Sequence, residues 1–178
     1  MSTLTEELHE SFVRPMRSLV LNQSNLDEKP LTLELTPPRP PRLRVYMYSL
    51  VGGVGERMRH EYKVVLRLRG QKPGRYGSFD HSGSAVALVV GYRADLDVFV
   101  LWDASLHLQF KNGGNLQVKD STVHTAAATG RANQLRSLST GSTEVVIACQ
   151  SSNLPQAIDD RIAWTGGLTE REWATFQN

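Results

Sequence analysis

Short segments with the alternation of β-strands, separated by glycine and proline turns, occupy the chain from Arg42 to Lys119. In residues 62–69, apolar side chains at the even positions alternate with mainly basic ones at the odd positions. Successive side chains of a strand point to opposite faces, so this segment has one apolar and one basic face. Apolar runs at 85–90 and 98–102 are typical of strands buried on both faces. The chain therefore has to fold around a sheet.

Helical patterns flank these strands. The spacing Thr3-Leu4-Thr5-Glu6 is that of a capping box before an amphipathic segment. A second helix is expected from Asp120 or Ser121 to about Leu138, and a third after Ser152 or Asn153, with a strand at 144–150 between them. We predict the α+β class: a twisted, mostly antiparallel sheet of about six strands flanked by two or three helices, with a short N-terminal helical appendage.

A proline-rich stretch sets the predicted domain boundaries. Residues 36–42 read Thr-Pro-Pro-Arg-Pro-Pro-Arg, a stiff extended segment that cannot donate a regular ladder of hydrogen bonds. We expect an appendage over residues 1–36, a connection over 37–42 and a main domain over 43–178.

Composition excludes several classes of protein. No apolar run approaches the length of a membrane span, and the first ten residues carry three Glu and no apolar signal region. Cys149 is the single cysteine, so an internal disulfide and a cysteine-based zinc site are both excluded, and a reducing cytoplasm is the expected location.

The net charge of +2 conceals a strong local imbalance. Residues 39–76 carry ten Lys or Arg and two Glu, a balance of +8, whereas the segments before and after this window each sum to −3. Such a field attracts polyanions even when the whole molecule is nearly neutral. Tyrosines interleave with these charges, so we predict binding of double-stranded DNA. The candidate DNA-binding residues are Arg44, Arg57, Arg59, Lys63, Arg67, Arg69, Lys72 and Arg75.

A carboxylate pattern offers an alternative, catalytic function. Asp97 and Asp103 bracket a hydrophobic strand, and Gln117 and Lys119 end a later one. Restriction-type nucleases hold Mg²⁺ with a carboxylate at one strand end and use a Glu or Gln, with a Lys, on an adjacent strand. An Mg²⁺-dependent endonuclease would use these four residues, with Asp97 and Asp103 as metal ligands. Aspartates at strand ends also cap turns for purely structural reasons, and binding alone requires no cofactor.

Several segments together resemble a known family. They are residues 61–67, Gly91-Tyr92, residues 95–103, His107, Phe110, residues 115–118 and residues 144–147. Over about residues 42–163, this order resembles a recurrent domain of prokaryotic restriction and defence proteins, found beside endonuclease modules or DNA methyltransferases. The polar residue after Leu-Gln-Val is not always Lys in that family, which favours a recognition role over catalysis by Lys119.

The resemblance implies DNA binding within a restriction system, with sensitivity to a modified base. Such a base is read in the groove or in a pocket after extrusion, and Tyr92, Trp102 and Phe110 are the candidates for stacking on it. Packing in the core is the other role open to these three rings. A third hypothesis is a protein-interaction subunit, whose basic face docks an acidic partner such as a nuclease or methyltransferase subunit.

Overall fold

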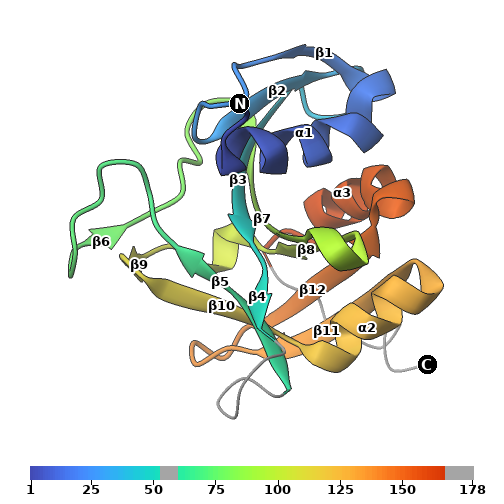
Figure 1. The fold of residues 1–178 in the computed structure, drawn as a ribbon. Helices are drawn as coiled ribbons and strands as arrows, with labels where there is room; N and C mark the ends of the chain where they lie inside the picture. The colour runs from blue at the N-terminus through green and yellow to red at the C-terminus, as the bar shows by residue number, and fades with distance from the viewer. Residues whose placement is uncertain (53–59, 167–178) are drawn as a thin grey trace.

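A mixed sheet of seven strands forms the centre of the molecule (Figure 1), seen in a computed structural model that describes residues 1–52 and 60–166. Its order is β1-β2-β3-β7-β8-β12-β11. The strands are β1 (Val20–Gln23), β2 (Leu31–Leu35), β3 (Arg42–Ser49), β7 (Ala85–Arg93), β8 (Val98–Trp102), β12 (Thr143–Gln150) and β11 (Arg131–Ser137). Only the β3–β7 pair of this sheet is parallel, so the α+β class and the mostly antiparallel sheet are confirmed.

Two small sheets are built mainly from the connections between these strands. The first has the order β10-β5-β4, with β10 at Gly114–Lys119, β5 at Glu61–Leu66 and β4 at Val51–Gly52. The second pairs β6 (Tyr76–Gly77) with β9 (Phe110–Lys111). The alternation predicted for β5 is confirmed, because Tyr62, Val64 and Leu66 are buried while Lys63 is partly exposed.

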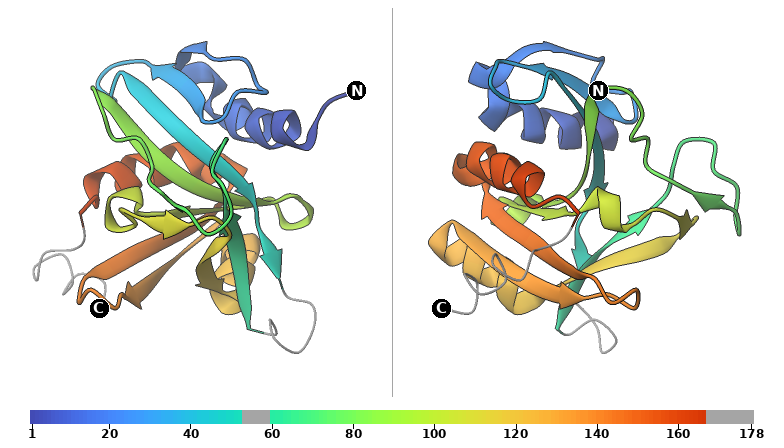
Figure 2. Two further views of the ribbon diagram at one scale, coloured as in Figure 1. Left: turned by 90° about the vertical axis from the view of Figure 1, so that its left-hand side faces the viewer. Right: turned by 180° about the vertical axis from the view of Figure 1, so that it is seen from behind.

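Within the described part of the chain, three α-helices cover the two faces of the main sheet (Figure 2). α1 (Leu4–Met16) and α3 (Leu154–Ala163) pack on one face, and α2 (Asp120–Thr129) packs on the other with β5 and β10. Short 3-10 turns follow several elements: η1 (Arg17–Leu19), η3 (Ala94–Leu96), η4 (Ala104–Leu106) and η5 (Ser151–Asn153). The predicted capping box is present, since the Glu6 N–H donates to Thr3 Oγ1 and the Thr3 N–H donates to Glu6.

Two apolar clusters hold these layers together. In β8, Phe99 and Leu101 face the α1–α3 side, whereas Val98, Val100 and Trp102 face the α2 side. Full burial of a strand on both faces is the arrangement that its continuous apolar run predicts. None of the helices in the described residues is long and apolar enough to cross a bilayer.

The N-terminal 36 residues share the core of the rest of the chain. Phe12 and Met16 of α1 are fully buried in the same cluster as β3 and β8. β2 adds to the edge of β3, with Leu31 opposite Val45.

The helix expected to run to about Leu138 ends much earlier, and that part of the prediction is wrong. α2 stops at Thr129, and Gly130 adopts φ +96°, a left-handed conformation that closes the helix. The Asn153 side chain donates to the Gly130 carbonyl. Residues Arg131–Ser137 then form the edge strand β11, because β12 offers their backbone groups a complete antiparallel ladder.

Candidate nucleic-acid interface

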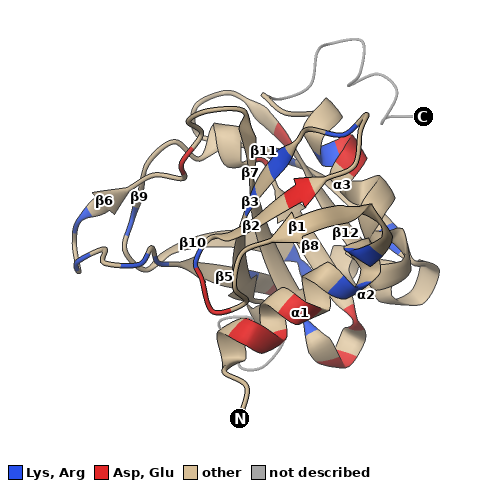
Figure 3. Ribbon diagram, turned by 90° about the horizontal axis from the view of Figure 1, so that it is seen from above, with Lys and Arg blue, Asp and Glu red and all other residues tan. Residues whose placement is uncertain are grey.

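A basic arm extends from the body of the protein (Figure 1); we use this name for residues 67–79 and 107–113, which carry β6 and β9. The arm contains five Lys or Arg and no Asp or Glu. Its cations are Arg67, Arg69, Lys72, Arg75 and Lys111, and all five are exposed. Figure 3 shows the blue segments that these residues give around β6 and β9. Within the described residues, none of the five forms a salt bridge.

Aromatic packing fixes the root of the basic arm on the sheet. Phe79, at the end of residues 67–79, and Phe110, in residues 107–113, are both buried, and their ring centroids lie 4.7 Å apart. Tyr46 of β3 packs on Phe79 at 4.8 Å, and its hydroxyl accepts the Asp80 N–H. Buried aromatic pairs of this kind stabilise a junction beyond the area they bury.

The Gln71 side chain organises the interior of the arm. Its Oε1 accepts the Leu68 N–H at 3.1 Å, and its Nε2 donates to the carbonyls of Arg75 and Phe110 at 3.0 and 3.3 Å. One amide therefore joins both segments of the arm. A loop that would otherwise expose unpaired backbone groups has an ordered conformation instead.

A tight turn brings two cations together at the end of this loop. The Arg75 N–H donates to the Lys72 carbonyl at 3.1 Å, with Pro73 and Gly74 between them. Gly74 has φ +72°, and proline followed by a glycine of positive φ is the signature of a type II turn. Lys72 and Arg75 therefore flank one turn at positions i and i+3.

Lys111 is a further cation of the arm that the charge pattern of residues 39–76 does not contain, because it lies 36 residues beyond Arg75 in sequence. The β6–β9 ladder places it directly opposite Tyr76. Its Nζ lies 5.6 Å from the centroid of the Tyr76 ring, which is 63% exposed. A cation beside an exposed aromatic face is a pairing that binds both phosphates and bases.

The other predicted DNA-binding residues have different positions. Arg44 is partly buried, and its Nη1 donates to the carbonyls of Asp80 and Ser82 at 3.2 and 2.7 Å. It also forms a salt bridge with Asp80, so Arg44 braces the loop after the arm. Lys63 is on β5, opposite Gln117. Arg57 and Arg59 lie outside the described residues. Arg67 and Arg69 follow β5 rather than extending its basic face, because the strand ends at Leu66.

Asp97 and Asp103 lie at opposite ends of β8, roughly 20 Å apart along the strand. Asp97 accepts the Ser151 hydroxyl at 2.6 Å and the Tyr92 hydroxyl at 3.1 Å. It stands at φ +49°, which Asp tolerates better than most residues. The structure therefore does not bring the two proposed metal ligands together.

Asp103 is buried in a structural network. It accepts the Gly166 N–H at 2.8 Å and the Ser105 N–H at 3.0 Å, and Arg161 Nη2 lies 3.5 Å from its Oδ2. Among the described residues, no group of three or more His, Cys, Asp or Glu is arranged to hold a metal ion.

Gln117 and Lys119 belong to β10, in the small sheet beside α2. The Gln117 carbonyl accepts the Trp102 indole N–H at 3.1 Å, and the Lys119 N–H donates to Gln134 Oε1 at 2.8 Å. Both residues are exposed, and these two hydrogen bonds use their backbone atoms.

The three aromatic candidates for base stacking lie in or against the core. Trp102 is fully buried and Phe110 is 8% exposed. Tyr92 is partly exposed and stacks on Phe99 with centroids 4.3 Å apart. Cys149 is likewise buried, and burial raises the pKa of its thiol to about 12, as expected for an inert core thiol.

The comparisons with known proteins identify one family. A family model described as "Methylase-associated X1" matches residues 41–158. No curated protein and no solved structure matches the chain.

Proposed function

This chain belongs to the methylase-associated X1 family, and on that premise we propose that it is a DNA-binding component of a restriction or defence system that works with a DNA methyltransferase. The observation that carries the DNA-binding part is the basic arm, with five exposed cations and no acidic residue. Family membership supports the association with a methyltransferase subunit.

The two-stranded form of the arm supports groove binding. B-DNA's major groove admits a two-stranded β-ribbon, and β6 and β9 form a short one. Lys72 and Arg75 flank the tight turn of the arm, whereas Arg67 and Arg69 lie at the foot of the arm, directly after β5 ends at Leu66. In the proposed complex, the turn enters the groove and all five arm cations contact phosphates on either side of it.

Electrostatics favour the arm over the rest of the basic window. Arg39, Arg42 and Arg44 form salt bridges with Asp159, Glu34 and Asp80, which reduces their attraction for an external anion. The arm cations have no such partners within the described residues, so their charge is available to phosphates.

The test is binding of duplex DNA measured by fluorescence anisotropy across a salt series. If all five arm cations contact phosphates, the slope of log K against log salt is about −4.5. Charge reversal of Lys72 and Arg75 should reduce both the affinity and the slope. Binding that is absent, or that does not depend on salt, would refute the proposal.

The partner is tested separately. Affinity purification of the tagged chain from its native cells should recover a DNA methyltransferase. Recovery should persist with the Lys72→Glu/Arg75→Glu variant if the partner binds a surface other than the arm.

A further inference from the structure

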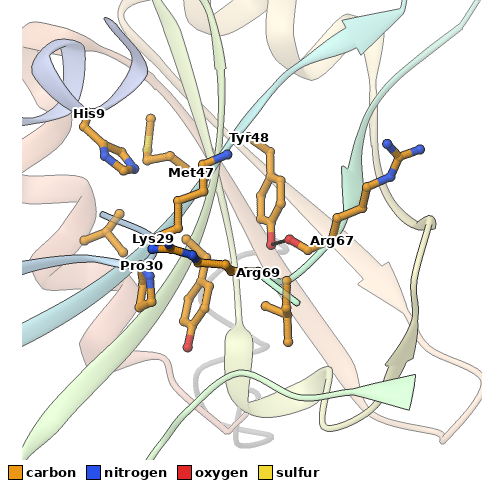
Figure 4. Close-up of a pocket in the computed structure, with 10 residues that line it drawn as sticks. His9, Lys29, Pro30, Met47, Tyr48, Arg67 and Arg69 are labelled. Atoms are coloured by element: carbon orange, nitrogen blue, oxygen red, sulfur yellow. Dashed lines mark hydrogen bonds between the residues drawn. The ribbon is translucent and has the colours of Figure 1, made fainter. Parts of the chain in front are cut away.

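A pocket of about 170 Å³ lies between four parts of the chain (Figure 4). They are helix α1, the loop that precedes β2, strand β3, and residues 67–69 at the foot of the basic arm. Its lining includes His9, Lys29, Met47, Tyr48 and Arg69. Among residues 1–52 and 60–166, none of those that line it is acidic. The pocket is separate from the exposed turn of the arm, and it joins parts of the chain that are far apart in sequence.

At this pocket, no strand of the described residues pairs with the edge of β3 beyond Val45. The register pairs Leu31, the first residue of β2, with Val45, whereas β3 continues for four further residues. The Leu35 N–H donates to the Pro41 carbonyl in the same register, so the odd-numbered residues of β3 direct their backbone groups toward β2. Met47 is the next of these, and its N–H and C=O therefore face the uncovered edge. A donor and an acceptor lie side by side there.

His9 adds a second acceptor. The residue is 1% exposed, and its Nδ1 lies 2.6 Å from the Leu26 carbonyl, an acceptor that requires the proton on Nδ1. Burial lowers the pKa of His9 against the opposing effect of that hydrogen bond, and the charge of Lys29 lowers it further. The neutral ring then carries its lone pair on Nε2, which has no hydrogen-bond partner among the described residues. Figure 4 shows the ring reaching from α1 into the group of lining side chains.

An aromatic wall and two cations complete the pocket. The Tyr48 hydroxyl donates to the Arg67 carbonyl at 3.2 Å, which fixes the ring beside the foot of the arm. In Figure 4 the Lys29 side chain extends toward Tyr48, whereas the Arg67 guanidinium points away from the pocket. Lys29 and Arg69 are exposed and form no salt bridge within the described residues.

We propose that this pocket binds a single nucleotide unit. The base lies against Tyr48, its polar edge meets the Met47 backbone and His9 Nε2, and its phosphate contacts Lys29 and Arg69. A nucleotide combines a flat apolar face, neighbouring donors and acceptors, and a negative charge, and each of these has a counterpart here. The pocket's size suits one planar ring, and its two cations favour an occupant that carries a negative charge. The proposal stands whether or not the arm binds duplex DNA.

The experiment is titration of the full chain with the four deoxynucleoside 5′-monophosphates and with a hexameric single-stranded oligonucleotide, followed by NMR chemical shifts. The first probe reports a free nucleotide, and the second reports a nucleotide within a strand. Saturable shifts at Met47, Tyr48 and His9 with either probe support the proposal. Lys29→Ala and Arg69→Ala should each weaken binding about fivefold.

The controls separate the pocket from general charge effects. Arg17→Ala removes a cation outside both the pocket and the arm and should leave monophosphate binding unchanged. His9→Phe should weaken the binding of both nucleosides and nucleotides, whereas Lys29→Ala should weaken the binding of the phosphorylated forms only. No shift at the pocket with any probe overturns the proposal, as does equal affinity for inorganic phosphate or binding insensitive to the Lys29 and Arg69 variants.

Discussion

Asp103 and Arg161 form a buried ion pair, with Arg161 Nη2 3.5 Å from Asp103 Oδ2 and side chains that are 1% and 2% exposed. Arg161 also donates to the carbonyls of Val145 and Trp164, so the pair ties α3 to the end of β8 and the start of β12. The carboxylate that the sequence pattern offered as a magnesium ligand thus has a structural role in this fold.

Removal of the cation should strongly destabilise the protein. Arg161→Met leaves the Asp103 carboxylate buried without its partner, and we expect the free energy of unfolding to fall by about 3–5 kcal/mol. Urea denaturation measures this change. The double variant Asp103→Asn/Arg161→Met should lose less free energy of unfolding than the two single variants together, because neither charge of this pair remains without its partner. Strictly additive losses would contradict the coupling between the two residues.

The turn of the basic arm should contribute about two phosphate contacts. We expect Lys72→Ala/Arg75→Ala to reduce the magnitude of the salt slope for duplex DNA by about 2 and to weaken binding at every sequence tested. Fluorescence anisotropy across a salt series provides both values. The matched control is Arg14→Ala/Arg17→Ala, in the last turn of α1 and at the start of η1, which makes the same change in net charge outside the arm. If both double variants weaken binding equally, net charge rather than the arm governs affinity.

Gln71 should control order in the arm more than global stability. Gln71→Ala removes three hydrogen bonds, each with a net value of about 1 kcal/mol: two lie within residues 67–79, and the third, to the Phe110 carbonyl, joins the two segments of the arm. Hydrogen exchange at residues 68–77 and 109–112 should therefore become faster. Amides of β8 should keep the protection of the wild type, because the core does not depend on Gln71; a uniform increase across the chain would disagree with this assignment.

His9 should make stability depend on pH. Its pKa is lowered in the folded state, so the unfolded chain binds more protons and the contribution of His9 is fully present above about pH 6.5. That contribution is lost as the pH falls below 6.5 through the folded pKa. Urea unfolding at pH 7.5 and 5.5 should show a smaller decrease for His9→Phe than for the wild type. Equal decreases in the two proteins would exclude His9 as a source of the dependence.

Local patterns were sufficient for much of the fold. The capping box at Thr3 and Glu6, the alternation of β5 and the two-sided burial of β8 follow from periodicities that a few neighbouring residues contain. The same reasoning failed after Gly130, where an alanine-rich helix pattern stops. The partner strand β12 lies beyond the next turn, and its ladder outweighs the local helix propensity of Arg131–Ser137.

The sequence by itself determined that positive charge is concentrated in one part of the chain, because charge is fixed by residue type. Only the tertiary structure decided which charges remain available. Arg44 forms a salt bridge with Asp80, whereas the β6–β9 ladder brings Lys111 to the other exposed cations of the arm. It likewise placed Asp97 and Asp103 at opposite ends of one strand and assembled His9, Met47 and Arg69 around one pocket. The physical reason is range: strand and helix patterns act over a few residues, whereas ion pairs and pockets join residues that only folding brings together.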